Sequence, residues 1–256
     1  MAEGVQMTPI RTALTAVITG AALLAASLPA LSTDRPGRAA ETSLETPAII
    51  GAFAIDRTEV TVGAFRKFLE ANGGKTAAER DGGGFEYTAG WTRRTGWNWS
   101  SPFGAPADPG EPAVHVTWRE AGDFCAAKGG RLPTFEEWAT AAYHEQRAKP
   151  TDGFESGEVY PYPVGERAEG MNTSSKRHRP VATTKRGVNG LYDMGANAWE
   201  WIADRRGDEA YTAGGSWWYG PEKTRRGGAQ WKRADFYAVY IGFRCAYDRP
   251  ANARKD

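Results

Sequence analysis

Cysteine and histidine are scarce in this chain. Of its 256 residues, two are cysteine and three are histidine. The histidines, His115, His144 and His178, stand in different segments without the spacing of metal ligands, so the sequence predicts no zinc or iron triad. His115 follows the apolar Val114 in an expected strand, and we expect it to be a packed core residue.

An excess of charge of one sign is also missing. The chain has 32 basic and 31 acidic residues, which gives a formal net charge of +1. This balance leaves no strong field to attract nucleic acid, so we expect no nucleic-acid partner. The basic stretch at 176–179 is short, and we expect a solvated loop there, with contact to an acidic partner as the alternative.

Long apolar runs are limited to one, at 13–31. Arg11 precedes this run and small residues follow it, which is the pattern of a signal peptide. We therefore expect a signal peptide over 1–32, a flexible spacer over 33–46, and an exported protein that is periplasmic or secreted. The run is also about long enough to cross a bilayer, so an uncleaved membrane anchor is the alternative. In an oxidising compartment an even number of cysteines favours a disulfide.

Glycine and tryptophan are abundant by contrast, with 31 and 10 residues. Tight glycine turns held by large aromatic side chains indicate a loop-rich fold. The periodic segments between the loops are short and of both kinds, which predicts one α+β domain over 47–250. The expected helices lie at about 61–71, from Thr117 to Gly129, and from Thr134 onward, where Thr134 and Glu137 form a capping box. The expected strands are a pair at 49–62 and strands at 211–219 and 238–247, and loops or short strands are expected at 73–112.

Five segments carry a family resemblance. They read DRTEVTVGAFRKFLEA at 56–71, PAVHVTWREAGDFCAAKGGRLPTFEEWATAA at 112–142, NGLYDMGANAWEWIADR at 189–205, GGSWWYG at 214–220 and IGFRCAYD at 241–248. In this order they resemble the formylglycine-generating enzyme, or sulfatase-modifying factor, family. The resemblance implies a variant C-type-lectin-like fold with a small twisted antiparallel sheet, two to three helices and long loops. Most motif residues are expected to be scaffold, among them Arg131, Glu137, Trp138, Trp199, Trp201, Gly242, Phe243 and Arg244.

The resemblance also fixes expectations for the two cysteines and for copper. Cys125 and Cys245 match a pair that forms a structural disulfide in the family. The enzymes of the family hold copper between two other thiolates, which follow the GGS motif. Counted without gaps from Gly214, the places of those thiolates are taken by Tyr219 and Thr224. Soft thiolates suit Cu(I) and hydroxyl oxygens do not, so we expect no copper and no formylglycine formation.

A calcium site is expected in the segment 193–200. Carried over from the family, its ligands are the side chains of Asp193 and Glu200 and the backbone carbonyls of Ala196 and Ala198. Carboxylates together with carbonyls of a tight loop suit Ca²⁺. The alternative is that both acids cap backbone amides. A second calcium site of the family, near Asn172, is expected to be absent because the basic stretch fills that region.

A ligand cleft is expected beside the GGS motif. Aromatic walls combined with arginine can grip a planar or anionic ligand, although ordinary packing of a loop-rich fold is the alternative. The candidate cleft residues are Trp217, Trp218, Tyr219, Arg225, Arg226 and Trp231.

The expected function follows from the family and from the missing copper cysteines. We expect an accessory or maturation factor that acts on a peptide or secondary metabolite, and the catalytic residues, if there are any, stay unassigned. A lectin-type binding module without catalysis and a structural subunit of an envelope assembly are the alternatives. The expected partners are accordingly a peptide, a metabolite or an envelope protein, with membrane contact only through an uncleaved export segment.

Overall fold

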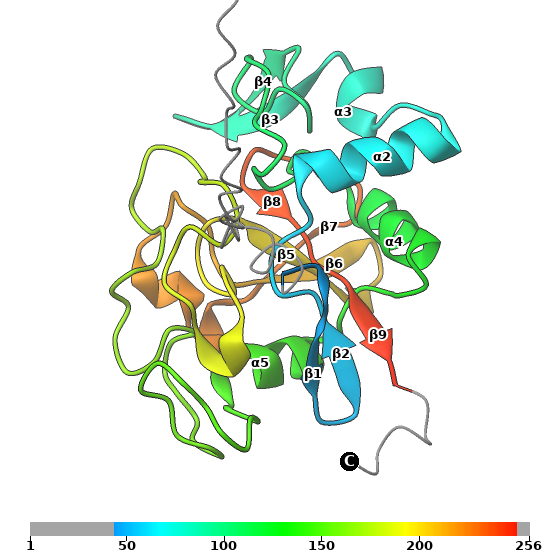
Figure 1. Ribbon diagram of the computed structural model, residues 1–256. Coiled ribbons are helices and arrows are strands. Elements are labelled where there is room, and N and C mark those ends of the chain that lie inside the picture. Colours follow the sequence, from blue (N-terminus) through cyan, green and yellow to red (C-terminus); the bar gives the residue numbers. More distant parts are fainter. Residues whose placement is uncertain (1–43, 250–256) are drawn as a thin grey trace, which may run out of the picture. The chain divides into compact units, whose positions relative to one another are not determined.

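Residues 44–249 are described by a computed structural model, shown in Figure 1. The expected signal peptide at 1–32 and most of the spacer expected at 33–46 lie outside this range. Within 44–249, no helix is both long enough and apolar enough to span a bilayer.

The first and last strands of the described chain lie in the same small sheet. Strand β1 (Ala48–Ile50) and strand β2 (Phe53–Ile55) form an antiparallel hairpin, which confirms the strand pair expected from 49 onward. Strand β9 (Ala246–Asp248) pairs antiparallel with β2, so that the blue and red ends of the ribbon meet in Figure 1. The start and the end of the domain are thereby joined by backbone hydrogen bonds.

The longer helices begin at threonines, as the sequence predicts. Thr61, Thr117 and Thr134 each accept a hydrogen bond from the backbone N–H three residues further on, which satisfies one free N–H of the first turn. The expected capping box of Thr134 and Glu137 is confirmed. These residues precede helices α2 (Val62–Asn72), α4 (Trp118–Ala127) and α5 (Phe135–Tyr143).

A four-stranded sheet forms the centre of the domain. Its strands lie in the order β7 (Gln230–Arg233), β6 (Glu209–Ala213), β5 (Trp199–Arg206) and β8 (Ile241–Gly242). Pairing is antiparallel except between β5 and β8, which run parallel. The α+β fold is confirmed, with this one short parallel pair in place of the purely antiparallel sheet that the resemblance implied.

The two faces of the central sheet cover different cores. Trp199 and Trp201 of β5 pack into a core shared with α2 and α4, whereas Ile202 packs into a second core shared with α5. The register places Lys232 of β7 opposite Ala210, whose side chain lies in the first core. Because side chains alternate along a strand, Lys232 shares its sheet face with Trp199.

The segment 73–112 contains short strands, as expected, and one turn of helix. Helix α3 (Ala77–Arg80) has its own capping box, formed by Thr76 and Glu79. Strands β3 (Gly83–Tyr87) and β4 (Trp91–Thr95) form a hairpin, and Phe85 accepts a backbone hydrogen bond from Val239 ahead of β8. This contact joins the middle of β3 to the carboxyl-terminal third of the chain. The remaining elements are the 3-10 turns η1 (Val188–Gly190), η2 (Pro221–Thr224) and η3 (Arg226–Gly228).

Candidate functional site

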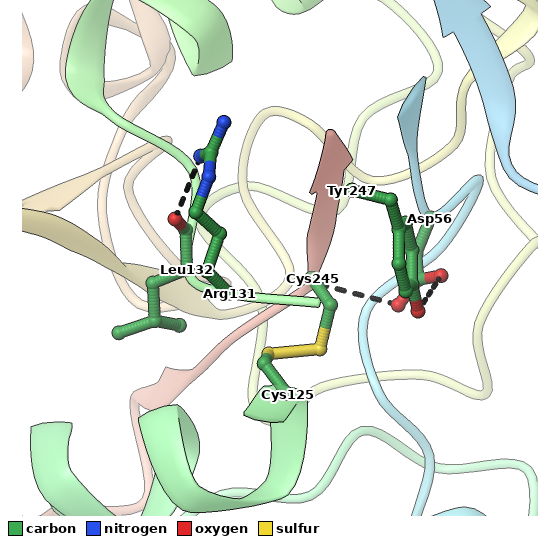
Figure 2. Close-up of a disulfide and its surroundings, with 6 residues drawn as sticks. All are labelled: Asp56, Cys125, Arg131, Leu132, Cys245 and Tyr247. Atoms are coloured by element: carbon green, nitrogen blue, oxygen red, sulfur yellow. Dashed lines mark hydrogen bonds between the residues drawn. A yellow bond between two sulfur atoms is a disulfide. The ribbon is translucent and has the colours of Figure 1, made fainter. Parts of the chain in front are cut away.

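Both cysteines of the chain are consumed in a disulfide. Cys125 in α4 and Cys245 ahead of β9 are bonded, with their Cα atoms 5.4 Å apart, and both are buried. Figure 2 shows the bond beside Asp56, whose carboxylate accepts hydrogen bonds from the Cys245 N–H and the Tyr247 hydroxyl. The expected pairing is confirmed. Since the sequence has only these two cysteines, the disulfide-bonded chain has no thiolate to offer a metal or a substrate.

The places expected for copper thiolates hold oxygen groups with other roles. Tyr219 is half-buried, its ring lies edge-on to Trp199 at 5.5 Å, and burial raises the pKa of its phenol. Thr224 is buried, and its hydroxyl donates to the carbonyl of Pro221 at 2.7 Å. Hydroxyl oxygens are hard ligands that do not suit Cu(I). The residues present therefore do not fit the copper centre of the family.

The six candidate cleft residues do not gather at one point. Trp217 and Trp218 are in ring contact with each other and with Tyr240, and Tyr219 lies beside Trp199. Arg225 instead donates to the hydroxyl of Tyr162. Arg226 pairs with Glu136, and Trp231 stacks on Tyr211 on the opposite face of the sheet. A ligand role for these side chains stays a prediction. The most compact group among them is formed by Trp217, Trp218 and Tyr219.

Three exposed aromatic side chains converge around Tyr240. Tyr87, Trp91 and Trp218 are 42%, 49% and 46% exposed. The rings of Trp91 and Trp218 lie 6.2 and 5.9 Å from that of Tyr240, and Tyr87 lies 5.3 Å from Trp91. We refer to Tyr87, Trp91, Trp218 and Tyr240 as the aromatic wall. Exposed aromatic groups that cluster in this way are typical of binding surfaces.

Sequence reasoning missed most of this wall. Trp218 was a candidate, but Tyr87, Trp91 and Tyr240 were not. A signal was present for two of them, because aromatic residues on both sides of the Gly90 turn indicate a hairpin that pairs them across its strands, as Tyr87 and Trp91 are paired.

A lysine, Lys232, lies near Tyr219 on the face of the central sheet that carries Trp199. The ammonium nitrogen of Lys232 lies 4.3 Å from the centroid of the Trp199 ring and donates to the side-chain oxygen of Gln230 at 3.1 Å. Burial and the nearby charge of Lys223 lower the pKa of Lys232 to about 7. An isolated lysine in a half-buried strand gives no sequence signal of such a contact, so sequence reasoning missed this residue as well.

The residues expected to hold calcium lie in a buried acidic cluster. Glu200 pairs with Arg244, which donates to both carboxylate oxygens at 2.8 Å, and it also accepts from the indole N–H of Trp138 at 2.7 Å. Asp193 accepts from the backbone N–H of Ala182 and from the hydroxyl of Thr184. Asp193 thus caps a backbone amide, as the alternative foresaw, whereas Glu200 accepts hydrogen bonds from the side chains of Trp138 and Arg244.

A third acid, Glu59, joins the cluster. Its carboxylate accepts hydrogen bonds from the side chain of Asn197 and the backbone N–H of Ala198. Burial and the neighbouring charges of Asp193 and Glu200 raise the pKa of Glu59, and burial also raises the pKa of Asp193. Three carboxyl groups face the one arginine of the cluster, Arg244, and their excess negative charge can be offset by a proton, as the raised pKa values indicate, or by a divalent cation.

The loop geometry permits a calcium ion but does not depend on one. Asp193, Ala196 and Asn197 have φ angles of 57°, 68° and 51°, so the chain turns sharply there and redirects its carbonyls. No three acidic, histidine or cysteine side chains converge as a metal site within 44–249, so an ion would need the carbonyls of Ala196 and Ala198 in addition to Asp193. Asp193 and the two carbonyls supply only part of the six to eight oxygens that calcium takes, and Glu200 is already held by Arg244.

The three histidines have different roles in the structure. His115 is buried and its Nε2 lies 3.0 Å from the carbonyl oxygen of Pro102, which confirms a core position. His144 ends α5. His178 is buried, with its Nε2 2.7 Å from the carboxylate of Glu111, to which Arg177 also donates. The stretch 176–179 is therefore not a wholly solvated loop, because His178 is buried against the carboxylate of Glu111.

The motif residues expected to be scaffold make structural contacts. Arg131 bridges Glu137 in α5 and Asp248 in β9, with nitrogen–oxygen distances of 2.6 and 2.7 Å. Trp201 donates its indole N–H to the carbonyl of Val116. Gly242 lies so close to the carbonyl of Ala113 that a Cβ atom there would be 2.9 Å from the oxygen. These contacts link helices, strands and loops that are distant in sequence.

Comparison with known proteins agrees with this arrangement. Residues 20–249 match the sulfatase-modifying factor enzyme 1-like domain. The chain is 33% identical over 190 residues to inactive C-alpha-formylglycine-generating enzyme 2 of Mus musculus, covering 59% of this chain and 58% of that protein. It is 31% identical over 180 residues to formylglycine-generating enzyme of Streptomyces coelicolor, covering 59% and 57%. The match thus spans less than two thirds of either relative.

A solved structure extends the comparison to the fold. PvdO from Pseudomonas aeruginosa is similar with a TM-score of 0.55 at 21% identity, covering 77% of this chain and 80% of that one. At this identity the likeness concerns the fold alone. With the domain match over 20–249, the chain belongs to the formylglycine-generating enzyme, or sulfatase-modifying factor, family.

Proposed function

We propose that this chain is an exported accessory or maturation factor that binds a peptide or secondary metabolite on its aromatic wall. The observation that carries the proposal is the convergence of Tyr87, Trp91 and Trp218 around Tyr240. Aromatic rings supply a large contact area at a small entropic cost and suit planar or aromatic ligand groups. The wall adjoins Tyr219, which stands at the expected place of a copper ligand.

The proposal excludes formylglycine formation by the copper mechanism. Both cysteines form the disulfide, and the expected copper positions are Tyr219 and Thr224. A relative in Mus musculus is itself named inactive. We expect a sulfatase-motif peptide incubated with this protein, copper and oxygen to keep its cysteine. Mass spectrometry of the peptide is the measurement, and conversion of the cysteine to formylglycine would contradict the proposal.

A calcium ion at Asp193 and the carbonyls of Ala196 and Ala198 belongs to the proposal as a structural ion. Its support is the excess of carboxylates over arginine in the buried cluster. The ion would offset that charge and hold the loop beside Gly214, since the N–H of Ala196 donates to the Gly214 carbonyl. The ion would not contact the aromatic wall, and its effect on the wall would pass through the GGS segment.

A lectin-type binding module is the second candidate, because the wall binds a ligand in either case. The two functions differ in what happens to the ligand. Deleting the gene in its host and comparing exported peptides and metabolites by mass spectrometry separates them. If the protein is a maturation factor, the deletion strain accumulates an unprocessed precursor. Returning the wild-type gene removes this precursor, and returning the gene for the Trp218→Ala variant does not. An unchanged set of exported compounds would favour the binding module or a structural subunit.

A further inference from the structure

A small cavity lies where three segments of the chain meet. They are α5 with His144 at its end, residues 159–161, and residues 225–227 after η2. We refer to the space between them as the arginine cavity. Its volume is about 330 Å³. None of the residues that line it belongs to the aromatic wall, so the cavity is a separate candidate site.

The lining of the arginine cavity carries positive charge. It includes Arg225 and Arg226, two of the candidate cleft residues, and no aspartate or glutamate. Arg226 is already paired with the carboxylate of Glu136, with both nitrogen–oxygen distances at 2.6 Å. Arg225 is exposed and has no acidic partner among residues 44–249. A cavity with an unpaired guanidinium and no acid in its lining favours an anion.

The guanidinium of Arg225 is held in place by Tyr162. It lies over the tyrosine ring, 4.5 Å from the centroid, and one terminal nitrogen donates to the hydroxyl at 2.7 Å. This contact uses one N–H group, and the others have no acceptor in the described part of the chain. A guanidinium that is already oriented loses less side-chain freedom when it binds a ligand. Its remaining N–H groups can accept both oxygens of a carboxylate at once.

The rest of the lining supplies apolar surface. Val159 is 61% exposed, which is unusual for a large apolar side chain in this protein. The hydroxyls of the two lining tyrosines are used inside the protein, since Tyr143 donates to the carbonyl of Thr224 and Tyr160 accepts from the N–H of Glu155. The tyrosines therefore add ring surface rather than a free hydroxyl. Apolar walls with a few placed polar groups are typical of small-molecule sites.

We propose that the arginine cavity binds a carboxylate carried on a small apolar or aromatic body, with the carboxylate on Arg225 and the body against Val159. The cavity volume is at the lower end of the range for small-molecule sites, about 300–1,000 Å³, which suits one ring or one apolar side chain. The proposal goes beyond the proposed function, because the site shares no residue with the aromatic wall. Such a carboxylate occurs in a free acid and at the carboxyl terminus of a peptide.

Binding of phenylacetate and of phenylacetamide, followed by saturation-transfer NMR, tests the charge requirement. The two probes have the same ring, but only the acid offers a carboxylate to Arg225. We expect the amide to bind at least about tenfold more weakly, and Arg225→Gln to weaken the acid by about tenfold. Arg66→Gln is the matched control, because Arg66 is also exposed and lies over an aromatic ring, 5.8 Å from the centroid of Trp99. The control should bind phenylacetate like the wild type.

A second pair of variants locates the bound probe. Val159→Glu puts a negative charge at the cavity and should weaken phenylacetate by about fivefold or more. Ile49→Glu is its control, since Ile49 is likewise 61% exposed but lies on β1, outside the cavity lining. Both positions are exposed, so neither substitution disturbs the core. Ile49→Glu should leave the affinity for phenylacetate unchanged.

Two further probes, N-acetyl-glycyl-phenylalanine and its amide, distinguish the sources of the carboxylate. Tighter binding of this peptide acid than of phenylacetate, with loss in the peptide amide, supports the proposal and points to a peptide carboxyl terminus. Binding of phenylacetate alone supports it with a free acid as ligand. The proposal is overturned if acids and amides bind alike, if no probe binds, or if Arg225→Gln leaves the affinity unchanged. Binding that depends on Trp218 and not on Arg225 would leave the aromatic wall standing and overturn the arginine cavity.

Discussion

Glu200 and Arg244 form a fully buried ion pair between β5 and the segment that follows β8. Arg244 also donates to the carbonyls of Asp56 and Tyr192, so each of its charged nitrogens has an acceptor. Such a pair adds little net stability compared with apolar packing, but removing one partner leaves a buried charge. The acids Glu59 and Asp193 close by increase the consequence of losing the arginine.

Replacing Arg244 by methionine should therefore destabilise the protein strongly. We expect Arg244→Met to lower the free energy of unfolding by about 3–5 kcal/mol, as measured by urea unfolding. Arg233→Met is the matched control, because Arg233 pairs with Asp235 at a similar distance of 2.7 Å on the exposed surface. The control should leave the free energy of unfolding nearly unchanged, because solvent screens an exposed ion pair. Equal effects of the two substitutions would contradict the buried-charge argument.

His115 should make stability depend on pH. Burial lowers its pKa to about 3, whereas an unfolded histidine has a pKa of about 6.5. Between these values the unfolded chain binds a proton that the folded chain does not. The free energy of unfolding therefore falls as the pH drops below about 6.5, by roughly 1.4 kcal/mol per pH unit for this group.

The variant His115→Asn isolates this contribution. Asparagine tolerates the φ angle of 58° at this position, so the backbone needs no rearrangement. The variant should be less stable at neutral pH and should lose less stability on acidification, since His178 still contributes. Urea unfolding between neutral pH and about pH 5 measures the slope. Identical slopes for the two proteins would show that His115 is protonated in the fold.

At the scale of elements, local signals were enough for the three longer helices but not for the short helix α3 or the main strand. The caps Thr61, Thr117 and Thr134 act within one turn, so their residues alone determine where each helix begins. Strand β5 has no such signal, because Trp199 to Ile202 are all buried and the alternation of a half-buried strand is absent. Its strand state depends on pairing with β6, which follows directly after the turn at Gly207 and Asp208, and with β8, which is distant in sequence. In the aromatic wall, the contacts of Tyr240 with Trp91 and Trp218 likewise join segments distant in sequence, whereas the pair of Tyr87 and Trp91 had a local signal.

The loop from Asp193 to Glu200 provides a test of the calcium proposal. A chelator such as EGTA should lower the melting temperature of the wild type if an ion offsets the buried carboxylates. Asp193→Ala should abolish that shift, whereas Asp193→Asn keeps an oxygen ligand and should retain part of it. Glu200→Ala is less informative, because it also leaves Arg244 without a partner.

Scanning calorimetry with elemental analysis measures both the shift and the metal content. The expected result is a calcium-dependent melting temperature in the wild type and none in Asp193→Ala. A wild type that contains no calcium and does not respond to EGTA would mean that Asp193 serves only to accept from Ala182 and Thr184.

At the scale of the whole molecule, contacts between distant segments hold the loops in place. β2 pairs with β9, Arg131 pairs with Asp248, and Cys125 is bonded to Cys245. All three connect the carboxyl-terminal strand to earlier parts of the chain. The family resemblance predicted the disulfide, whereas the pairing of β2 with β9 and the Arg131–Asp248 contact follow from the three-dimensional path of the chain. A loop-rich domain of this kind depends on such closures because its regular elements are short.

Removing the disulfide should therefore lower stability substantially. The bond closes a loop with a sequence separation of 120 residues, and in the chain-entropy model a closure of this size contributes roughly 4–5 kcal/mol. The double variant Cys125→Ala/Cys245→Ala should melt about 10–15 °C below the wild type, measured by calorimetry. The wild type treated with a reductant should melt at a similarly lowered temperature, which separates the loss of the bond from the loss of two buried sulfur atoms. Two thiols that titrate in the native, unreduced protein, or a double variant that melts with the wild type, would show that the bond does not hold the carboxyl-terminal strand in place.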